Sequence, residues 1–301
     1  MFKLKSIFVI IQFILNQPLS KGRGLNAINN FIRWQIFNKF FNSKLLIDWV
    51  DNAKFLISKG DTGLSGNLYC GFMEFEDMCF VLHYLREDDL FYDVGSNVGA
   101  YTILASAVKK CKSFSFEPIP ETFEKFIDQI KINRIENLVD ARNCGVGNKK
   151  EYLDFTLDLN CQNKVNKNPK NKKVKSIPVT TLDNEFKNNK SSFIKIDVEG
   201  YEKFVLDGGK KFFESPYLKA IIIELNGSGI EFGIRDEDLN QQIKNFGFTA
   251  VNYDPLTRSL NIKEGFNKKG NTIYLRNLNE ASQRCKSANR FLVHTAGKKY
   301  I

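Results

Sequence analysis

The sequence predicts an α/β fold in which a mostly parallel sheet is covered by helices on both faces. From residue 90 onward, short apolar runs typical of strands alternate with longer stretches of helical periodicity. Such alternation is typical of β-α-β units, whose parallel strands are joined by helices. The chain has 301 residues, 43% of them hydrophobic, which is enough for a substantial core.

The expected elements follow one another regularly along the chain. Strands are expected at residues 90–94, 112–117, 138–144, 192–197, 219–225, 248–253 and 272–276. Helices are expected at residues 74–86, 98–110, 120–134, 200–207 and 236–246. Two further β-like stretches, 151–158 and 173–181, predict an inserted hairpin with a solvated, Lys/Asn-rich tip at 160–173. Residues 60–71 contain four glycines, which favours a loop or short hairpin.

The first 59 residues predict a basic, aromatic and mainly helical extension. Residues 1–15 resemble a signal peptide, but no small-residue cleavage site follows them. Their nine-residue apolar run is too short to span a bilayer, because a spanning helix needs about 20 residues. Residues 25–41 show the apolar spacing of an amphipathic helix. We expect this extension to pack on the rest of the chain or to contact a membrane peripherally.

The net charge of +10 is concentrated in two segments. Residues 1–60 hold nine Lys/Arg and two acids, and residues 160–175 hold six Lys and no acid. The rest of the chain is slightly acidic, which argues against a general nucleic-acid surface and leaves an anionic membrane or acidic glycan as partners. The six cysteines form no C-x-x-C pair, so we expect reduced thiols in a cytoplasmic protein and no zinc site.

A glycine turn after the strand at 90–94 is the first candidate site. Gly95 and Gly99 allow unusual backbone dihedrals and close approach of a ligand, and Asp93 places a charge beside them. Ligands of open α/β sheets bind beyond the carboxyl ends of the strands. The turn therefore predicts a nucleotide-binding loop.

Glu117 is the second candidate, at the end of the next strand and directly before Pro118. It lies 22 residues after Gly95, a spacing that lets a carboxylate accept the hydroxyls of a bound ribose. A nicotinamide site would need G-x-G-x-x-G, but Asn97 stands where the central glycine belongs. The Asn97 side chain would crowd a diphosphate, which favours a ligand with a ribose and no phosphate, such as an S-adenosyl donor.

Acidic residues also follow the strand at 192–197, and they are the third candidate. Strand alternation places Lys195 and Asp197 on one face, and Glu199 follows two residues later. Asp197 or Glu199 would deprotonate an acceptor hydroxyl, with Lys195 steadying the carboxylates. Glu199 as a helix cap is the structural alternative. A second alternative is an Mg²⁺-type site formed by Asp197, Glu224 and Asn226, although no ligand spacing requires a metal.

Five motifs in order resemble the FkbM-type family of S-adenosylmethionine-dependent methyltransferases. They are residues 93–102, 116–118, 143–147, 180–183 and 194–202. The resemblance covers about residues 60–277 and implies a class I methyltransferase fold, Rossmann-like, with seven strands of which the last is antiparallel. It implies S-adenosyl-L-methionine as cofactor, with Asn143 near the adenine. The candidate cofactor-binding residues are Asp93, Gly95, Ser96, Asn97, Gly99, Tyr101, Glu117, Pro118 and Asn143.

The resemblance also implies O-methylation of a sugar hydroxyl in the assembly of cell-surface polysaccharide. We expect a small-molecule or glycan acceptor, no nucleic acid, and a cytoplasmic protein that contacts the inner face of the membrane peripherally. The expected division is an extension at 1–59, a methyltransferase domain at 60–280 and a tail at 281–301. A nicotinamide-dependent oxidoreductase and a non-catalytic scaffold that keeps the cofactor pocket are the alternatives.

Overall fold

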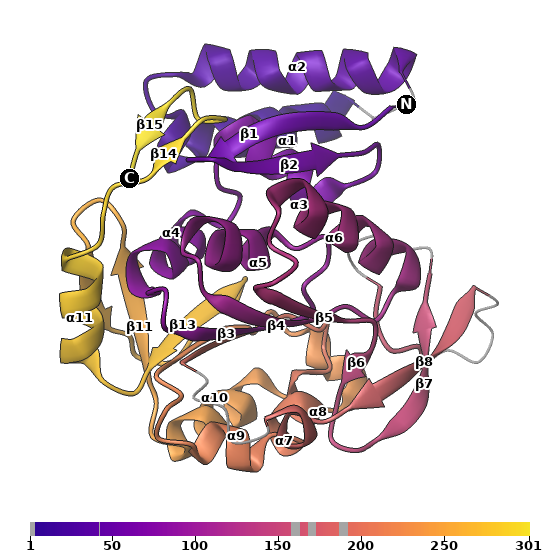
Figure 1. The fold of residues 1–301 in the computed structure, drawn as a ribbon, viewed down its shortest axis with the longest axis vertical. Helices are drawn as coiled ribbons and strands as arrows, with labels where there is room; N and C mark the ends of the chain where they lie inside the picture. Colours follow the sequence, from indigo (N-terminus) through magenta and orange to yellow (C-terminus); the bar gives the residue numbers. More distant parts are fainter. Residues whose placement is uncertain (1–3, 42, 158–162, 168–172, 187–191) are drawn as a thin grey trace.

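The computed structural model describes residues 4–41, 43–157, 163–167, 173–186 and 192–301, which form an α/β fold. Its central sheet has eight strands in the order β12-β11-β13-β10-β9-β3-β4-β5 (Figure 1). From one edge to the other, these are β12 (Ser259–Ile262), β11 (Thr249–Asp254), β13 (Asn271–Leu275), β10 (Ala220–Glu224), β9 (Phe193–Ile196), β3 (Leu90–Val94), β4 (Lys112–Phe116) and β5 (Val139–Arg142).

The strand directions confirm the predicted sheet. Strands β5, β4, β3, β9 and β10 are parallel to one another, whereas β13 is antiparallel to both of its neighbours, β10 and β11. These are the seven expected strands, with the last one antiparallel. The eighth strand, β12, pairs with β11 at the sheet edge and is an addition to the prediction. Its sequence, Ser-Leu-Asn-Ile, is short and half polar, so it carries little strand signal of its own.

Helices cover both faces of the sheet (Figure 1). One face carries α4 (Phe75–Tyr84), α5 (Ala100–Thr102), the π-helix η2 (Ile103–Val108) and α6 (Pro120–Asn133), and the other carries α7 (Leu182–Glu185), α8 (Glu202–Asp207), α9 (Lys210–Glu214) and α10 (Asp236–Asn245). Successive side chains along a strand point to opposite faces of the sheet and therefore belong to different hydrophobic cores. Phe91 and Phe193 belong to one core, and Tyr92 and Ile194 belong to the other. Helix α11 (Leu278–Lys286) lies beside the β11–β12 edge.

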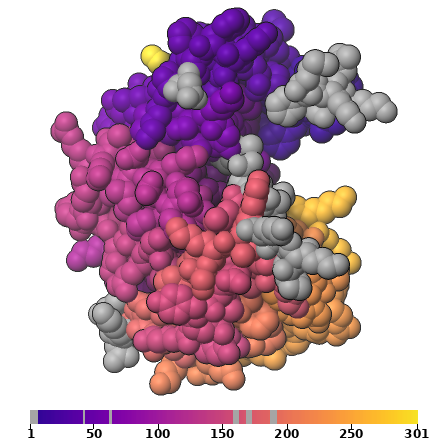
Figure 2. Space-filling model, turned by 90° about the vertical axis from the view of Figure 1, so that its right-hand side faces the viewer, coloured from indigo at the N-terminus to yellow at the C-terminus, as the bar shows by residue number. Residues whose placement is uncertain are grey.

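The N-terminal segment forms a layer at one end of the molecule (Figures 1 and 2). It consists of α1 (Leu4–Asn16), η1 (Pro18–Ser20), α2 (Gly24–Phe40), β1 (Leu45–Val50) and β2 (Ala53–Ile57). The β1–β2 hairpin was not predicted. Together with β14 (Leu292–Val293) and β15 (Lys299–Tyr300) it forms a sheet of order β15-β14-β1-β2. None of the helices in the described ranges is long and apolar enough to cross a membrane.

The shared sheet bears on the proposed division of the chain at residues 59 and 280. That division remains a proposal. Because strands from both terminal segments pair with each other, we expect the two segments to fold together rather than as independent appendages.

The prediction of a loop at residues 60–71 is wrong, because this stretch contains helix α3 (Thr62–Cys70). Leu64 and Leu68 lie one helical turn apart and are both buried, and α3 packs against α2 and β2. Burial of this apolar face outweighs the low helix propensity of the glycines.

A second sheet of three strands, in the order β6-β8-β7, contains the insert (Figure 1). Its strands are β6 (Gly145–Val146), β7 (Glu151–Thr156) and β8 (Val174–Thr180), and the last two form an antiparallel hairpin. Of the Lys/Asn-rich tip, residues 163–167 and 173 are described, and the remainder, including Cys161, lies outside the described residues. Val165 pairs with Phe155, so the described part of the tip folds back onto the hairpin.

Candidate active site

The glycine turn after β3 is pressed against the loop that follows β9. The amide N–H groups of Gly95 and Ser96 both donate to the Phe116 carbonyl, at 3.0 and 2.9 Å. Gly95 has a φ of +81°, and a Cβ added to it would lie 1.8 Å from the Asp197 carbonyl oxygen. Only glycine satisfies both the backbone conformation and this close packing.

Glu117 is held at the end of β4 by two backbone donors. Its carboxylate accepts the N–H groups of Asn97 and Ile119, both at 2.9 Å, and the residue is buried. Burial raises the pKa of this carboxyl to about 7, although the two N–H donors act in the opposite direction. The hydrogen bond from Asn97 ties the carboxylate directly to the glycine turn.

A pocket lies between the glycine turn, Glu117 and the inserted hairpin. It has about 670 Å³ of empty space, which includes a part that is open to solvent. It is lined by Val94, Gly95, Asn97, Phe116, Glu117, Pro118, Ile119, Thr122, Cys144, Gly145, Val146, Phe155, Asn163, Val165, Asp197, Val198, Glu199 and Tyr201. Candidate donor-binding and candidate acceptor-side residues therefore share one cavity.

Five of the nine candidate cofactor-binding residues are not among the residues that line the pocket. The Asn143 amide donates to the carbonyl oxygens of Glu117 and Pro118, at 2.9 and 3.0 Å, and so fixes the loop that carries the carboxylate. Gly99 packs under Phe126, where a Cβ would lie 2.4 Å from the ring. Ser96 is buried. These three residues shape the turn; the other two, Asp93 and Tyr101, lie beside Lys195.

Asp93 is buried below the turn and is only partly satisfied. Its Oδ2 accepts the Thr102 hydroxyl at 2.7 Å, and its Oδ1 has no hydrogen-bond partner among the described residues. Burial raises the pKa of this carboxyl to about 6, although the nearby Lys195 ammonium acts to lower it. A buried acceptor without a partner is uncommon and calls for a donor from a bound water or a ligand.

The buried Lys195 forms an ion pair with Asp197, whose side chain is partly exposed. The Nζ–Oδ2 distance is 2.8 Å, and the lysine side chain is 4% exposed. Burial acts to lower the pKa of Lys195, but Asp197 and neighbouring carboxylates more than compensate and raise it above its usual value. The ammonium also lies 4.7 Å from the centre of the Tyr101 ring. Lys195 is therefore a fixed positive charge at the end of β9.

Glu74, just before α4, was missed from the sequence and joins this group. It accepts the Tyr101 hydroxyl and the Asn271 amide, both at 2.8 Å. Nothing in the local sequence marks Glu74, because its partners come from α5 and β13, far along the chain. Its role is to hold the aromatic ring against which Lys195 lies.

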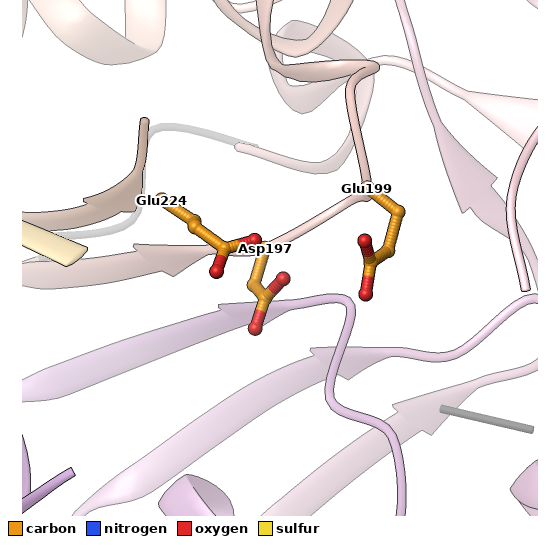
Figure 3. Close-up of side chains that lie close together, drawn as sticks. All are labelled: Asp197, Glu199 and Glu224. Carbon is orange, nitrogen blue, oxygen red and sulfur yellow. The ribbon is translucent and has the colours of Figure 1, made fainter. Parts of the chain in front are cut away.

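Three carboxylates converge at the ends of β9 and β10. One oxygen from each of Asp197, Glu199 and Glu224 lies within 4.8 Å of the others, and Figure 3 shows the three side chains close together. Burial, followed by the charge of Asp197, raises the pKa of Glu199 to about 7 and that of Glu224 to about 8. The cluster by itself assigns no metal, since acidic groups commonly gather without one.

Asn226, considered as an oxygen ligand with Asp197 and Glu224, is engaged locally. Its Oδ1 accepts the N–H of Ser228 at 2.9 Å, and the residue is exposed. Glu199 joins Asp197 and Glu224 in a cluster of three carboxylates, and the Asn226 Oδ1 already has this backbone partner.

The backbone that carries Glu199 is shaped by Glu202, which sequence reasoning also missed. The Glu202 side chain accepts the N–H groups of Val198 and Gly200, both at 3.2 Å, and is buried. Glu199 itself adopts a positive φ of +52°, a conformation uncommon for a residue with a side chain. Helix α8 begins only at Glu202, so Glu202 rather than Glu199 binds the free N–H groups before it.

The described part of the insert forms one wall of the pocket. Lys164 pairs with Glu231, and the Lys167 ammonium donates to the Glu231 carbonyl at 2.8 Å. The same ammonium lies 4.3 Å from the centre of the Phe232 ring. These contacts anchor the segment whose Asn163 and Val165 line the cavity.

Fold and site together define a Rossmann-like protein of the class I methyltransferase type. Residues 93–250 match the FkbM methyltransferase domain, which covers more than half of the chain, and the chain belongs to this family. The resemblance expected from the five motifs is thereby confirmed.

One curated relative is the hexuronic acid methyltransferase AglP of Haloferax volcanii. The two are 28% identical over 149 residues, which is 48% of this chain and 59% of AglP. The match therefore spans less than two thirds of that relative.

Among solved structures, the chain resembles the FkbM methyltransferase of Methylobacillus flagellatus KT. The TM-score is 0.45 at 12% identity, with 83% of this chain and 60% of that chain covered. It also resembles the putative methyltransferase SMU.1697c of Streptococcus mutans, solved in complex with SAH. That TM-score is 0.38 at 13% identity, with 66% of this chain and 94% of the other covered. Both scores are low, so the family assignment rests on the sequence match.

Proposed function

We propose that this protein is an S-adenosylmethionine-dependent O-methyltransferase that acts on a hydroxyl of a sugar or glycan intermediate of cell-surface polysaccharide. The observation that carries the proposal is the shared pocket, whose lining includes the Gly95 turn and Glu117 together with Asp197 and Glu199. Methyl transfer requires a donor and an acceptor in line across one cavity, and this arrangement supplies both sides.

On the donor side, the residues fit an S-adenosyl group. The two Glu117 oxygens each accept one backbone N–H, and each keeps a further lone pair for a ribose hydroxyl. The unpartnered Oδ1 of Asp93 suits an ammonium group such as that of the donor's amino-acid moiety. When bound, the donor supplies an electrophilic methyl group on a sulfonium.

On the acceptor side, Asp197 is proposed as the base that takes the proton of the acceptor hydroxyl. Lys195 fixes Oδ2 of Asp197 at 2.8 Å, and we assign the acceptance of the proton to Oδ1. Glu199 is the second candidate for this role, since its pKa of about 7 suits proton transfer near neutral pH. Glu74 and Tyr101 act through Lys195 and are positioning residues.

The sugar acceptor is favoured by the relative from Haloferax volcanii, whose name describes a hexuronic acid methyltransferase. We further propose that the protein works in the cytoplasm and contacts the inner face of the membrane through its basic N-terminal segment.

Transfer of a tritiated methyl group into fractionated cell-envelope glycans tests the proposed reaction. We expect label in a glycan fraction with wild-type protein and labelling at least about a hundredfold slower with the Asp197→Asn variant. A methyl ether on a hydroxyl resists mild alkali, whereas a methyl ester is hydrolysed. Label released by alkali would contradict hydroxyl methylation, and label confined to protein or nucleic acid would contradict the glycan acceptor.

Donor affinity is expected to fall as pH drops below about 7, by roughly tenfold per pH unit. A ribose hydroxyl donates to the ionised Glu117 carboxylate, whose pKa is about 7 in the free protein, so binding at lower pH first requires loss of a proton. Calorimetric titration with S-adenosylhomocysteine at pH 6, 7 and 8 measures this. The Glu117→Gln variant should bind more weakly and independently of pH; an unchanged pH dependence would place the titrating group elsewhere.

Chelation is expected to leave the reaction rate unchanged. We propose a metal-free site because Lys195 already supplies a fixed positive charge next to Asp197. The measurement is the initial rate of methyl transfer after dialysis against EDTA, with and without added Mg²⁺ or Mn²⁺. Loss of activity that a divalent cation restores would show that Asp197, Glu199 and Glu224 hold a metal instead.

A further inference from the structure

The outward faces of α1 and α2 carry an unusual concentration of exposed apolar side chains. Of the 17 large apolar side chains that are exposed in the described residues, nine lie between residues 8 and 41. On α1, Phe8 and Val9 are exposed by 68% and 62%, with Phe13 one turn further along the same side. A surface helix of a soluble protein normally presents polar residues there, so this surface is suited to a partner.

Helix α2 has two apolar faces instead of the single face that the sequence suggests. Ala27, Phe31 and Trp34 are buried against the rest of the protein. The second face contains Leu25, Ile32, Ile36 and Phe40, all exposed, with Leu25 at 85% and Phe40 at 69%. At about 100° per residue, this second face lies opposite the first. The contacts of α2 within the protein therefore leave a complete apolar face uncovered.

Charge identifies the kind of partner that this surface fits. Residues 1–47 contain seven Lys/Arg and no Asp or Glu. On α2, Arg33 and Lys39 are exposed and lie on either side of the outer apolar face. An apolar face flanked by basic residues is the pattern of a helix that lies in the interface of an anionic membrane. A second copy of the chain would bring the same positive charges and be repelled.

We infer that the outward faces of α1 and α2 form one lipid-binding surface, which lies flat on an anionic bilayer. The two helices pack against each other, and α2 lies at the extreme end of the molecule, where none of the other described elements covers it (Figure 1). Phe8, Ile36 and Phe40 enter the boundary between head groups and acyl chains, and Arg33 and Lys39 bind lipid phosphates. This inference names the residues that make the membrane contact of the proposed function. It rests on the proposed function only for the location of the protein at a membrane.

Co-sedimentation of the full-length protein with vesicles tests this surface. We expect binding to vesicles that contain phosphatidylglycerol, weaker binding to pure phosphatidylcholine, and release of much of the bound protein by high salt. The double variant Ile36→Ser/Phe40→Ser should lose at least about tenfold in affinity. Arg33→Gln/Lys39→Gln should lose the preference for phosphatidylglycerol. Both substitutions replace exposed side chains, so folding should be unaffected.

The matched controls are Leu256→Ser/Ile262→Ser, which removes two exposed apolar side chains at the β12 edge of the central sheet, and Lys210→Gln/Lys211→Gln on α9. Both should bind vesicles as the wild type does. Equal binding by the Ile36/Phe40 and Leu256/Ile262 variants would overturn the inference, as would absence of vesicle binding by the wild type.

Self-association is measured in parallel by sedimentation without lipid. A dimer that the Ile36→Ser/Phe40→Ser substitution dissociates would also overturn the inference, because the surface would then bind a second copy. Calorimetric binding of S-adenosylhomocysteine is measured on each variant. A variant that loses vesicle binding but keeps its affinity for S-adenosylhomocysteine has lost the lipid-binding surface alone. If the wild type does not bind S-adenosylhomocysteine, the proposed function is contradicted and the lipid-binding surface is not.

Discussion

Replacement of Gly95 by alanine is expected to weaken S-adenosylhomocysteine binding at least about a hundredfold, which corresponds to about 2.7 kcal/mol. The added Cβ would lie 1.8 Å from the Asp197 carbonyl oxygen, a backbone atom that cannot rotate away. The ends of β3 and β9 would have to separate, and with them the two sides of the pocket. The positive φ adds a cost of about 1–2 kcal/mol. Calorimetry and thermal unfolding measure the two consequences.

Gly233→Ala is the matched control for this substitution. Gly233 also has a positive φ, of +74°, but apart from its chain neighbours no atom of the described residues lies within 4 Å of an added Cβ. The variant therefore carries the backbone cost without the collision, and we expect a small loss of stability with donor affinity unchanged. Equal donor affinity in the Gly95 and Gly233 variants would show that the packing of the glycine turn on Asp197 does not shape the pocket.

Asp197→Asn is expected to lower kcat by about 10²–10⁴-fold while donor affinity stays the same. The amide keeps an oxygen for Lys195, so the buried ammonium retains a hydrogen-bond partner, but it cannot take the proton of the acceptor hydroxyl. Single-turnover methyl transfer at saturating donor measures the change, and calorimetry with S-adenosylhomocysteine verifies that the pocket is intact.

Asp207→Asn provides the comparison, because Asp207 also pairs with a lysine, Lys203, but lies at the end of α8 outside the pocket. Its turnover should match the wild type. Near-normal turnover of Asp197→Asn with donor binding preserved would exclude Asp197 as the base. A large loss in Glu199→Gln would then assign that role to Glu199.

The central sheet was predictable because each of its seven main strands has its own local signal. The runs at residues 90–94 and 219–225 are both mainly apolar, and they are followed by a glycine and an asparagine, respectively. The N-terminal hairpin was not predictable in the same way, since β1 pairs with β14 across some 240 residues of chain. Helix α3 was missed because burial of Leu64 and Leu68, a tertiary effect, overrides its glycine content.

The residues of the site also differ in whether the local sequence marks them. Glu117 could be found because its spacing from Gly95 is fixed by one β-α-β unit, and the structure joins it to the turn through the Asn97 N–H. Glu74 and Glu202 could not be found, because their significance lies in contacts with Tyr101 and with the backbone at Val198. Such supporting residues carry no motif and become visible only when the chain is folded.

Binding of an S-adenosyl group beside Glu117 is tested most directly by calorimetric titration of the full-length protein with S-adenosylhomocysteine and, in a parallel experiment, with NAD. We predict a micromolar Kd for S-adenosylhomocysteine, a loss of at least about tenfold in the Glu117→Ala variant and no heat from NAD. Binding of NAD would indicate a nicotinamide-dependent oxidoreductase. Binding of neither ligand would contradict a functional methyl-donor site and leave a non-catalytic scaffold.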